Sequence, residues 1–296
     1  MRSITRREAI KKGGRLFLGA ATCSLLPGFA TGCSNQALEP GMVAELMQKT
    51  KNANLSDIRL SVIYNNVPSN RDMRTDWGFA CLIEGLDKTI IFDAGRYDDL
   101  FMTNLSKLKV DPHQIDDLFI SHDHPDHIGG TLKLLDIRHD IDISLVHSFP
   151  SGFKSAIKKM GANVIETDQP RIVSAHCLST GEMQSFVKNE QALVIRTDEG
   201  SIILTGCAHP GVVEIVERAQ QITQQNVLLV MGGFHLLMDD ASSIRTKAAQ
   251  LKGLGVRYVA PSHCTGGEAI KILAELYGDR FIDSGVGRII TAKDIA

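Results

Sequence analysis

The sequence is poor in aromatic residues, in cysteine and in net charge, and each shortage excludes a class of protein. Aromatic residues make up 5% of the 296 residues and Trp77 is the single tryptophan, which argues against a carbohydrate- or base-stacking surface. The formal net charge of −2 argues against a nucleic-acid binder that neutralises phosphates. Six cysteines are too few for a disulfide framework. A packed globular protein remains, because hydrophobic residues make up 43% and charged residues 22%.

The first 33 residues have the composition of a targeting segment. Six basic residues and one acidic residue fall within positions 1–15, and an apolar run at 16–30 follows, too short to span a bilayer comfortably. The segment around Arg6 and Arg7 resembles a bacterial twin-arginine export signal. Residues 30–33 resemble a degenerate lipoprotein cleavage site ending at Cys33. We expect a protein exported to the periplasm or membrane-anchored at the cell surface, with a lipid on Cys33 or an uncleaved anchoring helix as alternatives.

The rest of the chain is acidic and continuous. Six of the 32 basic residues and one of the 34 acidic residues lie in 1–33, so 26 basic and 33 acidic residues remain and the net charge is about −7. Residues 34–57 are polar and are expected to form a linker, with a short helical patch at 42–49. No further linker divides 58–296, which we expect to form one domain.

The hydrophobic period changes repeatedly within this domain. Apolar runs of strand type lie at 60–64, 79–83, 89–92, 118–120, 141–146, 192–196, 202–204, 227–230 and 258–260. Helical patterns lie between them at 100–108, 131–137, 153–160, 212–222, 244–254 and 268–276. The alternation predicts an α/β fold whose sheets are covered by helices on their outer faces.

The densest group of potential metal ligands is the segment 120–130, Ile-Ser-His-Asp-His-Pro-Asp-His-Ile-Gly-Gly, which follows an apolar strand and opens a helix. Imidazoles and carboxylates on a tight loop can converge on a cation, and this donor set suits zinc, iron or manganese. His122 and His124 can serve one ion from an extended segment. Asp126 and His127, one turn further on, can serve a second. We expect one or two divalent ions, with zinc as the first candidate and iron or manganese as alternatives.

This H-x-H-x-D-H pattern resembles that of the metallo-β-lactamase superfamily, and the resemblance covers about residues 58–290. It implies an αββα sandwich and usually a binuclear metal site that activates a water. Asp93, at the end of the strand at 89–92, matches the carboxylate that props the metal-binding loop in that superfamily. His263, after the strand at 258–260, matches its last histidine ligand.

Five further segments give a narrower resemblance. Together they are similar to the dihydropteroate-synthase-like subgroup, which includes the archaeal pterin-condensing enzymes and is otherwise described mostly as metal-dependent hydrolases. The segments are 64–66 (Tyr-Asn-Asn), 76–79 (Asp-Trp-Gly-Phe), 205–211 (Thr-Gly-Cys-Ala-His-Pro-Gly), 232–236 (Gly-Gly-Phe-His-Leu) and 261–266 (Pro-Ser-His-Cys-Thr-Gly).

The chain also departs from the superfamily pattern. The usual mid-chain histidine in a Pro-Gly-His-like turn is absent, and Cys207 stands where an aspartate normally bridges two metals. His209, two residues on, is the stronger candidate ligand, while Cys207 can be a thiolate ligand or a small buried apolar residue. His235 can contact substrate or metal, or be a structural histidine. The expected metal ligands are His122, His124, Asp126, His127, Cys207, His209 and His263, and the expected catalytic residues are Asp126 and His235.

Three functions fit these residues. The leading hypothesis is a metal-dependent hydrolase of a small molecule, in which a metal lowers the pKa of a water and Asp126 accepts its proton. The alternative, implied by the subgroup, is a synthase that forms a carbon–nitrogen bond on a pterin-like substrate while a metal stabilises a leaving diphosphate. Export argues against this alternative, because pterin biosynthesis belongs in the cytoplasm. An exported pterin- or metal-binding protein without turnover is the third.

Overall fold

The computed structural model of the protein describes residues 38–296, so the expected export segment at 1–33 lies outside the described residues. Two sheets, one of seven strands and one of six, form the centre of the fold. None of the helices in 38–296 is long and apolar enough to cross a membrane.

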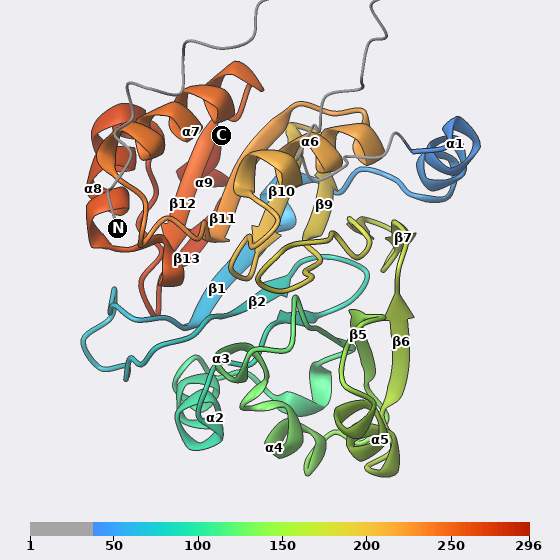
Figure 1. Ribbon diagram of the computed structural model, residues 1–296. Helices are drawn as coiled ribbons and strands as arrows, with labels where there is room; N and C mark the ends of the chain where they lie inside the picture. The colour runs from blue at the N-terminus through green and yellow to red at the C-terminus, as the bar shows by residue number, and fades with distance from the viewer. Residues whose placement is uncertain (1–37) are drawn as a thin grey trace, which may run out of the picture. The chain divides into compact units, whose positions relative to one another are not determined.

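The seven-stranded sheet contains both antiparallel and parallel pairs. In spatial order its strands are β13 (Ile289–Thr291), β1 (Arg59–Tyr64), β2 (Ala80–Glu84), β3 (Ile90–Phe92), β4 (Asp117–Phe119), β5 (Asp142–Val146) and β6 (Asn163–Thr167). Strands β3 to β6 pair in parallel, while β13, β1, β2 and β3 pair antiparallel. Helices α2 (Asp98–Lys107), α4 (Thr131–Leu135) and α5 (Ser151–Lys159) lie on its outer side (Figure 1).

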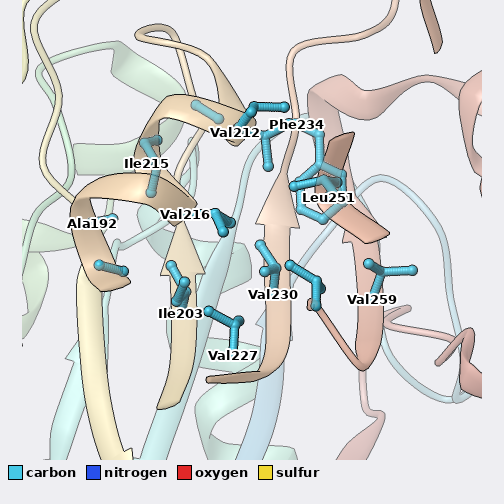
Figure 2. Close-up of a cluster of buried hydrophobic side chains, with 14 of the residues drawn as sticks. Ala192, Ile203, Val212, Ile215, Val216, Val227, Val230, Phe234, Leu251 and Val259 are labelled. Atoms are coloured by element: carbon cyan, nitrogen blue, oxygen red, sulfur yellow. The ribbon is translucent and has the colours of Figure 1, made fainter. Parts of the chain in front are cut away.

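In the six-stranded sheet, the strands whose loops carry the candidate ligands are parallel to one another. Its strands in order are β12 (Tyr258–Ser262), β11 (Val227–Gly233), β10 (Gly200–Thr205), β9 (Leu193–Thr197), β8 (Cys177–Ser179) and β7 (Arg171–Ile172). Strands β10, β11 and β12 run parallel. Helices α6 (Val212–Thr223), α7 (Ala241–Gly253) and α8 (Gly267–Tyr277) cover its outer face. Figure 2 shows Val216 of α6 above Ile203 and Val230 of the sheet, and Val212 beside Phe234.

Three hydrophobic clusters correspond to the three interfaces of a four-layer sandwich. One lies between the two sheets and includes Phe92 and Phe119 of one sheet and Leu204 of the other. The other two lie between each sheet and its helices. The expected αββα architecture is therefore confirmed, because each sheet buries one face on the other sheet and one face on helices.

The segment at 34–57 differs from the linker we expected, because its described part packs on the domain. Helix α1 (Pro40–Lys49) buries Leu46 in the cluster that contains α6. Beyond the helix, the Ala53 N–H donates to the carbonyl of Arg196 at 2.9 Å and the Leu55 N–H donates to Asp198 at 3.0 Å. Residues 40–57 thus extend the second sheet and its helical layer.

Short elements complete the fold at its edges and at the site. Strands β6, β7 and β13 were not expected, and neither was α9 (Ala292–Ile295), which closes the chain with a capping box. Helix α3 (Pro125–Ile128) carries part of the histidine-rich segment. Strands β3, β4, β10, β11 and β12 each lead, at their carboxyl ends, into a loop that carries a candidate ligand or its support, which is where α/β proteins commonly place their sites.

Candidate metal centre

Three imidazoles form the first group of donors. His122 and His124 follow β4, and His209 follows β10, so the group joins loops from both sheets. One nitrogen from each ring lies within 4.8 Å of the others, and His122 Nε2 is 3.1 Å from His124 Nδ1. The third imidazole therefore comes from the segment in which the sequence departs from the superfamily pattern.

Asp126, His127 and His263 form the second group. The Asp126 carboxylate lies 3.2 Å from His263 Nε2, which in turn lies 3.3 Å from His127 Nε2. The Cys207 thiol lies between the two groups, 3.3 Å from His127 Nε2 and within 4.8 Å of a His122 ring nitrogen. Ring nitrogens this close repel each other unless a proton or a cation lies between them, so the donor set fits divalent metal ions.

Asp93 supports His127 in the way the resemblance implied. Its Oδ2 accepts a hydrogen bond from His127 Nδ1 at 2.7 Å, which leaves the Nε2 of that ring facing the other donors. The Ser121 N–H and hydroxyl also donate to this carboxylate, at 2.7 and 2.8 Å. Burial alone would lower the pKa of His127, but the adjacent Asp93 charge outweighs it and raises the pKa to about 9.

Glu190 supports His209 and was missed by the sequence analysis. Its Oε1 accepts hydrogen bonds from the backbone N–H groups of 206, 207 and 208, at 2.9 to 3.0 Å. Its Oε2 accepts from His209 twice, at 3.0 Å from the backbone N–H and 2.8 Å from Nδ1. Burial acts to raise the pKa of this carboxyl, but these hydrogen bonds hold it below its usual value. The sequence signal was an acidic residue three positions before the buried strand β9.

Asn65 and Asn66 hold His263 from the end of β1. The backbone N–H of His263 donates to Asn65 Oδ1 at 3.1 Å, and Nδ1 of its ring lies 3.2 Å from Asn66 Oδ1. Both side-chain amides are therefore directed at His263. Trp77 is 39% exposed and its ring centroid lies 4.8 Å from that of His263, so it is a neighbour of the site and not a core residue.

The backbone at the site is locally strained. Asp93, Ala208, His235 and His263 have φ angles of 56°, 59°, 52° and 49°, in the left-handed region that non-glycine residues seldom adopt. Each of the four follows the carboxyl end of a central strand. Such strain persists where surrounding contacts over-determine the backbone, as they commonly do at functional sites.

The remaining histidines and aspartates differ in whether they lie near the donor groups. His235 is exposed, its ring centroid lies 4.6 Å from that of His209, and one of its ring nitrogens lies within 4.8 Å of donor atoms of Cys207 and His209. Asp123 points to Lys188, with which it forms an ion pair at 2.9 Å. Burial acts to raise the pKa of Asp126, but its hydrogen bond with His263 and the histidine charges hold the pKa well below the usual range. Four other histidines belong to none of the donor groups in 38–296: His113, His139, His147 and His176.

A family model described as the metallo-beta-lactamase superfamily matches residues 78–263, more than half of the chain. The chain belongs to the metallo-β-lactamase superfamily. The matched region runs from the residue after Trp77 to His263 and so contains both donor groups. The histidine-rich segment at 120–130 had predicted both the family and the fold. Members of this superfamily typically bind divalent metal ions.

Individual proteins also resemble the chain over most of its length. It is 28% identical over 261 residues to the 7,8-dihydropterin-6-methyl-4-(beta-D-ribofuranosyl)-aminobenzene-5'-phosphate synthase of Methanocaldococcus jannaschii, covering 72% of this chain and 89% of the relative. Among solved structures, Tm1679, a metal-dependent hydrolase of the beta-lactamase superfamily, matches with a TM-score of 0.67 and 23% identity, over 79% of this chain and 99% of Tm1679. YhfI from Bacillus subtilis matches with a TM-score of 0.59 and 17% identity, over the same shares.

Proposed function

We propose that this protein is a metal-dependent enzyme that joins a pterin-like molecule to an aryl amine through a carbon–nitrogen bond. The observation that carries the proposal is that two donor groups, each with residues from both sheets, lie side by side in this chain. The chain also aligns with a pterin-related synthase over 89% of the length of that relative. The relative's name describes a product in which a dihydropterin 6-methyl group is attached to an aminobenzene. We therefore reverse the order of the two leading hypotheses from the sequence.

The residues that would hold the metals are His122, His124 and His209 in the first group and Asp126, His127 and His263 in the second, with Cys207 beside both. A bound divalent ion supplies Lewis acidity toward an anionic leaving group such as diphosphate. Zinc is the first candidate because nitrogen and sulfur donors outnumber carboxylates.

Asp126 is the proton acceptor in this proposal. Its side chain is 15% exposed, unlike the fully buried carboxylates of Asp93 and Glu190. As the amine nitrogen attacks the pterin methylene and the carbon–oxygen bond to diphosphate breaks, the amine loses a proton that Asp126 can take. His235 and Trp77, both exposed beside the site, are placed to contact the substrate.

Hydrolysis by a metal-activated water is the second candidate. Asp126 would accept a proton from water in the same position. The predicted export of the chain favours this reaction, because a periplasmic or surface-anchored enzyme would be separated from cytoplasmic pterin biosynthesis. A binding protein without turnover is the remaining alternative.

Metal analysis followed by a paired assay tests the proposal. Purified protein is incubated with a dihydropterin carrying a methylene diphosphate, with and without an aminobenzene ribofuranosyl phosphate, and products are followed by mass spectrometry. The proposal expects diphosphate release that depends on the amine and yields the conjugate. Release without the amine, with oxygen from labelled water in the product, would establish hydrolysis instead. Metal-loaded protein with no turnover on pterins, lactones or phosphoesters would support binding.

A further inference from the structure

Two of the four free cysteines in residues 38–296 meet at the metal centre. Cys207 follows β10 and Cys264 follows β12, and their sulfur atoms lie within 4.8 Å of each other. Cys264 Sγ also lies 3.5 Å from the carbonyl oxygen of Cys207. The other two, Cys81 and Cys177, lie in the core between the sheets. The meeting of Cys207 and Cys264 is therefore a local arrangement at the site.

Gly233 of β11 leaves the space in which Cys207 and Cys264 can approach each other across that strand. Strand β11 lies between β10 and β12, so side chains at its end would normally separate Cys207 from Cys264. A Cβ at Gly233, the last residue of β11, would lie 2.6 Å from Cys264 Sγ and 3.2 Å from Cys207 Cα. The thiols use the space that a larger residue would fill.

An imidazole of the metal centre faces the same two sulfurs. Single donor atoms of Cys207, Cys264 and His263 all lie within 4.8 Å of one another. Both cysteines are almost completely buried, with 4% and 5% of their surface exposed. Two thiols and an imidazole around one point match the mixed sulfur and nitrogen ligand sets of zinc sites.

We propose that Cys207 and Cys264 are both metal ligands and, next to His263 of the second donor group, make the second metal position sulfur-rich, beside the three-imidazole position. This proposal rests on the proposed function only in requiring that the chain binds metal. Each thiol gives up its proton when it binds the ion, so two protons leave for each ion bound there. The two halves of the centre are chemically different, and the sulfur-rich half selects zinc, ferrous iron, cobalt or cadmium over magnesium and manganese.

Sulfur ligation has a spectroscopic signature that is independent of activity. Cobalt is titrated into metal-free protein and the thiolate-to-cobalt charge-transfer band in the near ultraviolet is recorded. We expect this band in the wild type, at roughly half intensity in Cys207→Ser and in Cys264→Ser, because each loses one of two sulfur ligands, and absent from the double variant. Cys81→Ser and Cys177→Ser are matched controls, because they remove buried thiols outside the site, and should keep the full band.

X-ray absorption on the zinc-loaded wild type gives the same answer without a variant. We expect sulfur neighbours at about 2.3 Å from zinc, in addition to nitrogen neighbours at about 2.0 Å. Bound zinc with only nitrogen and oxygen neighbours would overturn the proposal while leaving the proposed function intact. A cobalt band that survives in the double variant would also overturn it. Full sulfur ligation without turnover would instead count against the proposed enzyme activity alone.

Discussion

Glu190 and His209 are joined by two hydrogen bonds, one to the backbone N–H of His209 at 3.0 Å and one to its ring Nδ1 at 2.8 Å. The buried carboxylate thus fixes both the turn that carries the histidine and the orientation of its ring. With Nδ1 engaged, Nε2 is the nitrogen left to bind a metal. Asp93 does the same for His127 through a bond of 2.7 Å. Both histidines, one in each donor group, are therefore oriented by a buried carboxylate.

Replacing Glu190 by Gln should weaken the first metal position and the fold together. The amide N–H₂ would face backbone N–H donors and leave some of them unpaired, so we expect a loss of about 2–4 kcal/mol in the free energy of unfolding. We also expect metal affinity to fall about 10- to 100-fold, because the His209 ring loses its orienting partner. Glu182→Gln, on the same loop but outside the donor groups, is the control for denaturant unfolding and metal titration. Unchanged affinity in Glu190→Gln would show that His209 does not need this support.

His122→Ala and His127→Ala should each lower metal content and abolish activity while the protein stays folded. The three hydrophobic clusters do not include these rings, so loss of the metal should affect activity more than structure. Metal per chain is measured by elemental analysis and folding by circular dichroism. His113→Ala, outside the donor groups, should match the wild type. Equal metal content in the wild type and both site variants would contradict the assignment.

The raised pKa of the Asp117 carboxyl should lower the free energy of unfolding as the pH rises. Burial raises its pKa to about 7, against the opposing effect of Lys88 at 3.8 Å, while the pKa of an unfolded aspartate is about 3.9. Between these values the folded state binds a proton that the unfolded state has released, so the contribution is fully present below about pH 4 and is lost as the pH passes 7.

Asp117→Asn tests this pH dependence by removing the titrating group. Relative to wild type, the variant should gain about 1–4 kcal/mol in the free energy of unfolding between pH 4 and pH 8, measured by urea denaturation. Asp116→Asn, the neighbouring carboxylate, is the control. A difference between wild type and Asp117→Asn that stays constant with pH would mean that Asp117 is ionised throughout.

Export through the twin-arginine route remains a proposal for the segment that precedes the described residues. Replacing Arg6 and Arg7 by lysine keeps the positive charge but removes the paired arginines, so precursor should accumulate in the cytoplasm. Fractionation and immunoblotting measure this, and replacing Lys11 and Lys12 by arginine is the control. Mature protein outside the cytoplasm in the Arg6, Arg7 variant would refute the route.

Local patterns in the sequence were enough to predict much of the site. His122, His124, Asp126 and His127 lie within six positions, so their convergence follows from one loop and needs no knowledge of the rest of the fold. The central strands were also predicted, because buried parallel strands are continuous apolar runs.

The parts that were missed depend on contacts between distant segments. Glu190 acts on the backbone N–H groups of 206–208, and backbone groups leave no mark in a sequence. Helix α1 is short, and only its contact with α6 shows that it belongs to the core. Strand β6 has one fully buried residue, Thr167, so it lacks the apolar run that identified its neighbours.

Both donor groups combine residues that are far apart along the chain. His127 and His263, whose Nε2 atoms nearly touch, are 136 residues apart, and each group takes ligands from both sheets. Closing loops of this length is entropically costly until the core between the sheets has formed. A ribosome-bound chain lacking β12 therefore has no complete second group with which to capture an ion. If the second group holds a metal as we propose, the ion can meet its full set of ligands only after both sheets have come together.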